Sequence, residues 1–366
     1  MRCRMISIPY RDLSVKDPNL KRELMDAVDK VLSHGRLILG PEVSMLEQEI
    51  AKFCNKKFAV GVNSGTDALY FALRALDIGP GDEVITTPLS WIATLNAIVL
   101  CGATPVFVDI GEDMNINPAL VENAITHKTK AILPVHFTGK MCDMSAIASI
   151  AAKNGLKVIE DASQAFGAKI QNKVAGSWGY VNCFSLNAMK ILNAYGEAGI
   201  IVTDDAHVFD KLTSLRYAGT INKEDCHYPS LNGRIDTIQA AMLLVELKRL
   251  TPKINRLQEI ARIYTTHLND IVKCPDDEGS FHVYYSYTIL TDRRDELKNF
   301  LLEKGIETKI QHPILMPYHT AYKQKFKPYI PMAEKIVNQI LCLPNHEKLT
   351  NEDVRHIVET VKFFFR

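Results

Sequence analysis

The chain of 366 residues carries a formal net charge of +1, and 47% of its residues are hydrophobic. This length exceeds the size at which one core usually keeps growing, so we expect two domains with a sizeable core. The near balance of acidic and basic residues argues against a dedicated nucleic-acid binder, and no apolar run approaches the length of a membrane span.

The N-terminus and the cysteines indicate the compartment. The opening MRCRMISIPYRDL lacks the apolar segment of a secretory signal. The eight cysteines are scattered singly and none falls in a CxxC pair, so zinc and redox motifs lack support. We therefore expect a cytoplasmic protein with reduced thiols, no metal site, and no nucleic-acid or membrane partner.

Helical and extended patterns alternate along the first part of the chain. Apolar residues at helical spacing predict helices over 19–34 and Pro41–Phe53. Further helices are predicted to begin at Ser64 and Ile92. Short apolar runs predict strands, which we expect at Phe58–Val62, 84–87, 105–108 and 131–135.

Two of these helix starts have a second interpretation. Backbone N–H groups at a helix start attract an anion, and glycine lets the backbone come close, so Gly65 and Thr66 are candidates for binding a phosphate group. The alternative is plain capping of the helix by Ser64 or Asp67. Trp91, at a strand-to-helix turn, is either a core residue or an apolar face for a cofactor ring.

The stretch 157–190 has the strongest chemical signal. A first apolar run ends in Asp161, and a second run over 181–186 is followed by Lys190. Buried parallel strands deliver such side chains to the carboxyl edge of a sheet, where ligands bind. A desolvated lysine amine forms a Schiff base with a carbonyl, a carboxylate keeps a pyridinium nitrogen protonated, and pyridoxal phosphate requires both. Taken alone, Lys190 is more often a solvated residue and Asp161 a helix cap.

Several blocks spread along the chain have a recognisable sequence and order: VNSGTDALYFALRAL, EDASQAFGA, CFSLNAMK, YGEAGIIVT and NGRIDTIQAA. They resemble the DegT/DnrJ/EryC1/StrS family of sugar aminotransferases, over nearly the whole chain. The resemblance implies an α/β, fold-type I large domain of three layers around a mostly parallel sheet, followed by a small α+β domain. Leu186 and Asn187 depart from the family, which commonly has an aromatic residue and His or Phe there, and Ala198 replaces a common glycine.

The resemblance also implies how the cofactor, pyridoxal 5'-phosphate, is held. Lys190 binds it covalently, Asp161 faces its ring nitrogen, and Trp91 stacks on its ring. Gln164, which we expect at the start of a helix, packs near the ring and its 3′ oxygen.

The phosphate group has its own set of residues. Gly65 and Thr66 are expected to bind it through the helix start, and Ser185 through its hydroxyl. Family analogy puts Asn232 into the phosphate site of a neighbouring subunit, whereas composition alone makes it a turn residue before a helix. We therefore expect a homodimer with shared active sites.

The C-terminal part has a different pattern. We expect a bridging helix over 253–271, a strand over 281–289, a helix over 295–304, a strand over 307–311, and a last helix capped at Thr350. This predicts a large domain over 1–250 and a small domain over 251–366. The loop 312–319 either faces the substrate or, as is commoner for histidines in a proline-rich loop, is structural.

The predicted function is transfer of an amino group from an amino acid, with L-glutamate expected, to a keto sugar. The family implies a nucleotide-linked sugar in surface-polysaccharide or amino-sugar biosynthesis. The alternatives are a non-nucleotide keto sugar, a small phosphorylated ketone, a pyridoxal-phosphate-dependent sugar dehydratase, or a non-catalytic regulatory protein with the same fold. Lys190 argues against a dehydratase, because dehydratase relatives have histidine there.

Overall fold

A computed structural model describes residues 6–276 and 279–366 of the chain. Its main feature is a seven-stranded sheet with the order β1-β9-β8-β5-β4-β2-β3. Within this sheet only β9 runs against its neighbours, so the predicted mostly parallel sheet is confirmed. The strands are β1 (Phe58–Val62), β2 (Glu83–Thr86), β3 (Thr104–Phe107), β4 (Thr129–Leu133), β5 (Lys157–Asp161), β8 (Val181–Ser185) and β9 (Gly199–Thr203).

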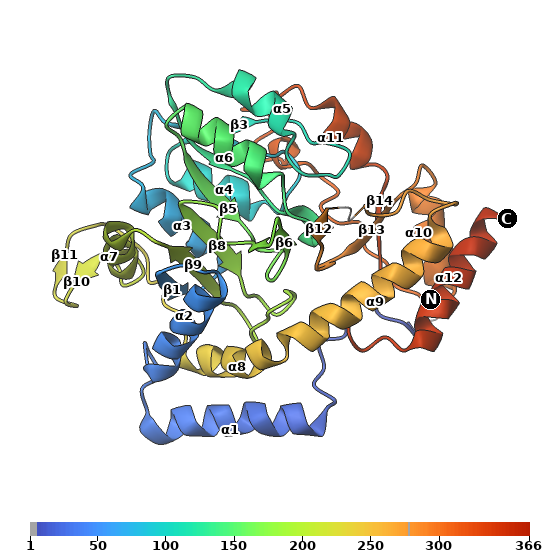
Figure 1. The fold of residues 1–366 in the computed structure, drawn as a ribbon, viewed down its shortest axis with the longest axis horizontal. Coiled ribbons are helices and arrows are strands. Elements are labelled where there is room, and N and C mark those ends of the chain that lie inside the picture. The colour runs from blue at the N-terminus through green and yellow to red at the C-terminus, as the bar shows by residue number, and fades with distance from the viewer. Residues whose placement is uncertain (1–5, 277–278) are drawn as a thin grey trace.

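Helices cover both faces of this sheet (Figure 1). One apolar core contains residues of α2 (Pro41–Phe53), α6 (Met144–Lys153) and α8 (Thr237–Lys248). The other contains residues of α3 (Gly65–Ala75), α4 (Ala93–Leu100) and α7 (Ala206–Leu215). Successive strand residues belong to different cores, as with Val158 and Ile159 of β5, because side chains alternate across a sheet. The fold is therefore the expected three-layer α/β arrangement.

The first helix, α1 (Pro18–His34), packs along α8 (Figure 1). Asp17 caps its start, and Gly35 ends it with a left-handed φ of 69°. The remaining short helices are α5 (Pro118–Val121), α11 (Pro331–Ile336) and the 3-10 turns η1 (Glu122–Ala124), η2 (Phe137–Gly139) and η3 (Met316–Tyr318).

The long helix α9 (Leu250–Leu268) runs from α8 to the C-terminal elements (Figure 1). These are the antiparallel pair β13 (Tyr287–Leu290) and β14 (Ile340–Leu343), with α10 (Arg294–Glu303) and α12 (Asn351–Phe365). The predicted cap of the last helix is confirmed, since Thr350 and Asp353 form a capping box. Near the other end of the chain, Ile8 bridges to Ile306.

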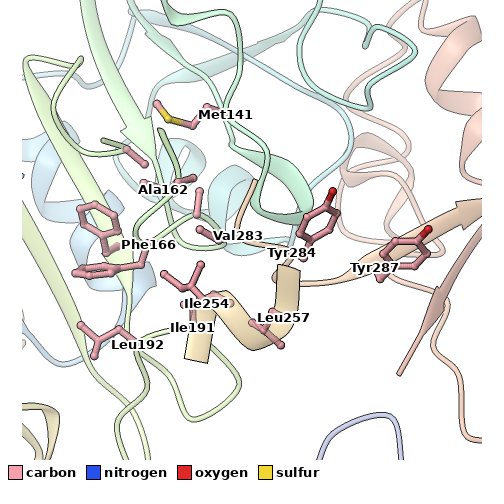
Figure 2. Close-up of a cluster of buried hydrophobic side chains, with 14 of the residues drawn as sticks. Met141, Ala162, Phe166, Ile191, Leu192, Ile254, Leu257, Val283, Tyr284 and Tyr287 are labelled. Atoms are coloured by element: carbon pink, nitrogen blue, oxygen red, sulfur yellow. The ribbon is translucent and has the colours of Figure 1, made fainter. Parts of the chain in front are cut away.

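An apolar cluster joins α9 to the middle of the chain, as Figure 2 shows. Ile254 and Leu257 of α9 belong to the same core as Ile191, Leu192 and Val283. All five side chains are buried. Because Ile191 and Leu192 directly follow Lys190, this packing fixes the backbone next to that lysine.

The predicted strand over 281–289 is wrong in its middle. The chain instead forms β12 (Ser280–Phe281) and then β13, because Tyr284 has a left-handed φ of 50°, which interrupts an extended backbone. The predicted strand over 307–311 is reduced to a single bridge between Lys309 and Cys342. Minor pairings complete the fold. β12 pairs with β6 (Lys169–Ile170), which pairs in turn with β7 (Lys173–Val174), and β10 (Thr220–Ile221) pairs with β11 (Asp225–Cys226).

Across the described residues, none of the helices combines the length and apolarity needed to cross a membrane. The seven cysteines among these residues are all free thiols. Cys3 lies outside the described residues.

Candidate active site

Neighbouring strands bring Asp161 and Ser185 to the same edge of the sheet. Strand β5 ends at Asp161 and the parallel strand β8 ends at Ser185. Ile159 and Cys183, two residues earlier on each strand, pack in the core beneath α3 and α4. Because side chains alternate, Asp161 and Ser185 lie on that same face, next to the starts of α3 and α4.

Asp161 is a buried carboxylate held by neutral donors. Only 3% of its surface is exposed. Thr94 Oγ1 donates to its Oδ2 at 2.8 Å, and the backbone N–H of Ser163 donates to its Oδ1 at 3.2 Å. It forms no ion pair with any residue that the structure describes. Since a buried charge is costly without an opposite charge, this carboxylate suits a cationic ligand group.

The start of α3 is open for an anion. Ser64 caps the N–H of Asp67 at 3.0 Å, which leaves the first N–H groups of the helix, at Gly65 and Thr66, without an intrahelical partner. A Cβ on Gly65 would lie 2.5 Å from Cβ of Ser185, so only glycine permits this approach. Backbone N–H groups and a serine hydroxyl therefore meet at one point, which suits a phosphate group.

Lys190 lies in a turn after β8. Asn187 shapes that turn: its carbonyl accepts from the N–H of Lys190 at 2.8 Å, and its side chain bonds to the N–H of Met189 and to Glu197. The Lys190 Nζ lies 4.8 Å from the ring centroid of Tyr285 and forms no ion pair within the described residues. Asn187 therefore fixes the backbone beside the lysine.

One cavity of about 440 Å³ contains most of the predicted site residues. Trp91 lines it with 58% of its surface exposed, so it is available to a ring. The cavity does not include Asn232, which is exposed and bridges to Tyr217. The predicted site residues that line the cavity are Gly65, Thr66, Trp91, Asp161, Gln164, Ser185 and Lys190.

The prediction that Gln164 begins a helix is wrong, because it lies in a turn. Its Oε1 accepts hydrogen bonds from the N–H of Thr138 at 2.9 Å and from Nε2 of Gln311 at 3.2 Å. These two bonds fix the Oε1 end of the amide, and its NH₂ group makes no hydrogen bond to the residues that the structure describes.

Sequence reasoning missed several cavity residues. Thr94, Tyr285 and Lys309 line the cavity without any motif that marks them, and Glu197 lies in the block YGEAGIIVT but was not assigned to the site. His312 also lines it, although the sequence favoured a structural role for its loop. Burial and the positive charges of Lys190 and Lys309 lower the pKa of His312 to about 3, so it is neutral at ordinary pH.

A second buried carboxylate, that of Glu160, precedes Asp161 in β5 and stabilises the end of this strand. Glu160 accepts hydrogen bonds from Nε2 of His136 at 2.8 Å and from the N–H groups of Gly176, Trp178 and Gly179. Burial favours the neutral form of Glu160, but these bonds and His136 outweigh it and lower the pKa of the carboxyl. This network holds the strand end that presents Asp161.

These residues fit pyridoxal phosphate. An anion-binding helix start at α3, a buried carboxylate and a lysine amine without ion pairs to described residues, and an exposed indole all line one cavity. The fold and site define a fold-type I pyridoxal-phosphate enzyme. The chain matches the DegT/DnrJ/EryC1/StrS aminotransferase family over residues 18–362 and belongs to it. It is therefore a pyridoxal-phosphate-dependent aminotransferase, and solved structures related to it contain the cofactor in its pyridoxal or pyridoxamine form.

Individual relatives cover nearly the whole chain. A protein of Geobacillus stearothermophilus named pleiotropic regulatory protein is 41% identical, over 99% of each chain. The dTDP-3-amino-3,4,6-trideoxy-alpha-D-glucose transaminase of Streptomyces venezuelae is 37% identical, over 97% of this chain and 95% of the relative. The crystal structure of S. venezuelae DesV superposes with a TM-score of 0.95 at 37% identity, covering 98% of both chains.

Proposed function

We propose that this enzyme transfers an amino group from an amino acid, L-glutamate, to a keto sugar attached to a nucleoside diphosphate. The observation that supports it best is the cavity in which Asp161, Lys190 and the start of α3 meet. The acceptor class is supported by the S. venezuelae relative, whose name describes a transaminase of a dTDP-linked sugar.

In this proposal Lys190 Nζ holds the cofactor and later moves a proton at the substrate carbon. When bound, pyridoxal phosphate supplies an electron sink that stabilises negative charge at that carbon. Asp161 Oδ2, fixed by the Thr94 hydroxyl, keeps a proton on the ring nitrogen. Trp91 and Gln164 line the same cavity, where Trp91 would cover one face of the bound ring and Gln164 would lie near its 3′ oxygen.

The phosphate is bound, in this proposal, by Gly65, Thr66 and Ser185, and by Asn232 of a second copy of the chain. Asn232 is exposed and lies outside the cavity of its own chain, which is consistent with a role in another subunit. Its chain neighbour Leu231 is 53% exposed, and Ile38, which bridges to Asp236, is 56% exposed. Such apolar residues favour contact between copies.

Space for a nucleotide is available beside the active site. A second cavity of about 590 Å³ shares Met189 and Lys190 with the first. Seven lysine and arginine side chains and four carboxylates line it, an excess of positive charge that favours an anionic group such as a diphosphate.

We also propose that residues 1–250 form the cofactor-binding part and 251–366 a smaller part, divided where α9 begins.

The test is the second half-reaction, from the pyridoxamine form back to the lysine-bound cofactor. The purified holoenzyme is converted by L-glutamate to its pyridoxamine form and then offered a panel of ketones, and return of the absorption of the lysine-bound cofactor identifies the acceptor. We expect return with nucleotide-linked keto sugars. Return only with non-nucleotide ketones would refute the nucleotide assignment and leave the transaminase assignment standing.

A further inference from the structure

The cavity has a positively charged side that the roles above leave unused. Lys309 lines the cavity, and its ammonium forms no ion pair among the described residues. It lies 5.8 Å from the ring centroid of Tyr10. The guanidinium of Arg11 lies 5.6 Å from that same ring and 5.0 Å from the ring of Tyr285. With Lys190, these side chains form a group of cations at one side of the site.

Tyr285 lies among these cations and has an unused hydroxyl. Within the described part of the chain this hydroxyl makes no hydrogen bond, whereas the hydroxyl of buried Tyr264 donates to the carbonyl of Pro344 at 2.8 Å. The Tyr285 ring also lines the cavity. A free hydroxyl next to cations is suited to donate a hydrogen bond to an anion.

The titration of the neighbouring groups agrees with a positive potential. Burial alone raises the pKa of Tyr285, but the charges of Lys190, Arg11 and Lys309 outweigh burial and lower it. Burial first, and then Lys190 and Lys309, lower the pKa of His312 to about 3. Both pKa shifts contain a contribution from nearby positive charges. A bound anion is therefore favoured at this side of the cavity.

We propose that Lys309 and the Tyr285 hydroxyl bind the α-carboxylate of the amino-acid donor. The carboxylates that line the cavity, Asp161 and Glu197, repel that group elsewhere in it. When Lys190 holds the cofactor, Lys309 and Arg11 remain as the cations at this side. The inference rests on the proposed transaminase function and adds the recognition site of the donor.

The experiment compares L-glutamate with 4-aminobutyrate, which is glutamate without its α-carboxylate. Each amine is mixed with holoenzyme, and the loss of absorption of the lysine-bound cofactor gives the ratio of the rate constant to the apparent Kd. The preference for glutamate is this ratio for glutamate divided by the ratio for 4-aminobutyrate. We expect Lys309→Gln to reduce the preference for glutamate roughly 10- to 100-fold, because a charge-assisted hydrogen bond is lost. Tyr285→Phe should reduce it by a smaller factor in the same direction.

Two controls accompany these variants. Lys309→Arg keeps the charge and should retain most of the preference. Lys130→Gln removes an exposed lysine of β4, outside the residues lining the cavity, and should change nothing. An unchanged preference in Lys309→Gln, or weaker binding of the ketone acceptor alone, would overturn the inference and leave the proposed function standing. A wild-type holoenzyme that reacts with neither amine would overturn both.

Discussion

The hydroxyl of Thr94 donates a 2.8 Å hydrogen bond to the carboxylate of Asp161, linking the first turn of α4 to the last residue of β5. Ser90, four residues earlier and just before α4, is hydrogen-bonded to the Thr94 hydroxyl at 3.0 Å. The carboxylate is therefore oriented by side chains that lie far from it in the sequence. The carboxylate of Asp161 also lines the cavity, where its oxygens can accept further hydrogen bonds.

Replacing Asp161 with Asn should lower the rate of each half-reaction by about 10²- to 10⁴-fold, because an amide cannot hold the ring nitrogen protonated. Thr94→Val keeps the shape of Thr94 and the charge of Asp161, and should cost only about tenfold. Stopped-flow rates of the glutamate half-reaction measure both. Equal losses of rate in the two variants would contradict a separate role for the negative charge of Asp161 beyond its hydrogen bond with Thr94.

Lys190→Ala should abolish turnover and covalent attachment of the cofactor while leaving the fold intact. The lysine makes no ion pair with a described residue, so its removal breaks no buried charge pair. Absorption of the bound cofactor and circular dichroism measure the two effects. A variant that still turns over at the wild-type rate would contradict the role of Lys190.

Gly65→Ala should weaken cofactor binding, because its Cβ would lie 2.5 Å from Cβ of Ser185 and 2.9 Å from the Cα of that residue. Relief of this clash moves the start of α3 and costs about 1–3 kcal/mol. Dissociation of the cofactor on dialysis and the urea midpoint report the change. The matched variant is Gly79→Ala, whose new Cβ would have its nearest contact at 3.5 Å and should behave as the wild type.

Shared active sites predict complementation. Lys190→Ala and Asn232→Ala chains should each be inactive, and mixing them under exchange conditions should restore part of the activity, since a mixed dimer would contain one intact site. Activity of the mixture against the separate variants is the measurement. No recovery despite subunit exchange, or an active monomer in sedimentation, would speak against a site built from two chains.

Acidification should destabilise the protein partly through His282. This buried ring stacks on Tyr284 at 4.0 Å, and its Nδ1 accepts from the N–H of Tyr284. Burial, with a contribution from Lys140, lowers its pKa from 6.5 to about 3. Below pH 6.5 the His282 ring therefore binds a proton in the unfolded chain but stays neutral in the folded chain. The free energy of unfolding falls as the pH drops from 6.5 toward 3.

Between pH 7.5 and pH 5 this single group should cost about 2 kcal/mol. His282→Asn retains an acceptor near the position of Nδ1 and cannot titrate, so its stability should depend less on pH. Urea midpoints of both proteins at the two pH values provide the comparison. An identical pH dependence would mean that His282 is protonated in the folded state as readily as in the unfolded chain.

The sequence by itself determined the layered fold and the two central residues. Alternating apolar runs and helical spacing depend on near neighbours, so β5 ending at Asp161 and the helix beginning after Ser64 were predictable from local pattern. Lys190 was identifiable because it follows a buried strand within a recognisable block. The wrong expectation for 281–289 arose because alternation does not reveal a left-handed residue such as Tyr284.

Only the tertiary structure decided which other side chains meet there. Thr94 is 67 residues from Asp161, and Gln311 is 147 residues from Gln164, yet each pair is hydrogen-bonded. Lys309 approaches the cavity because its backbone pairs with Cys342, a contact that no periodicity encodes. Long-range packing fixes these positions, since the free energy that orders them comes from contacts between distant segments and not from local propensity.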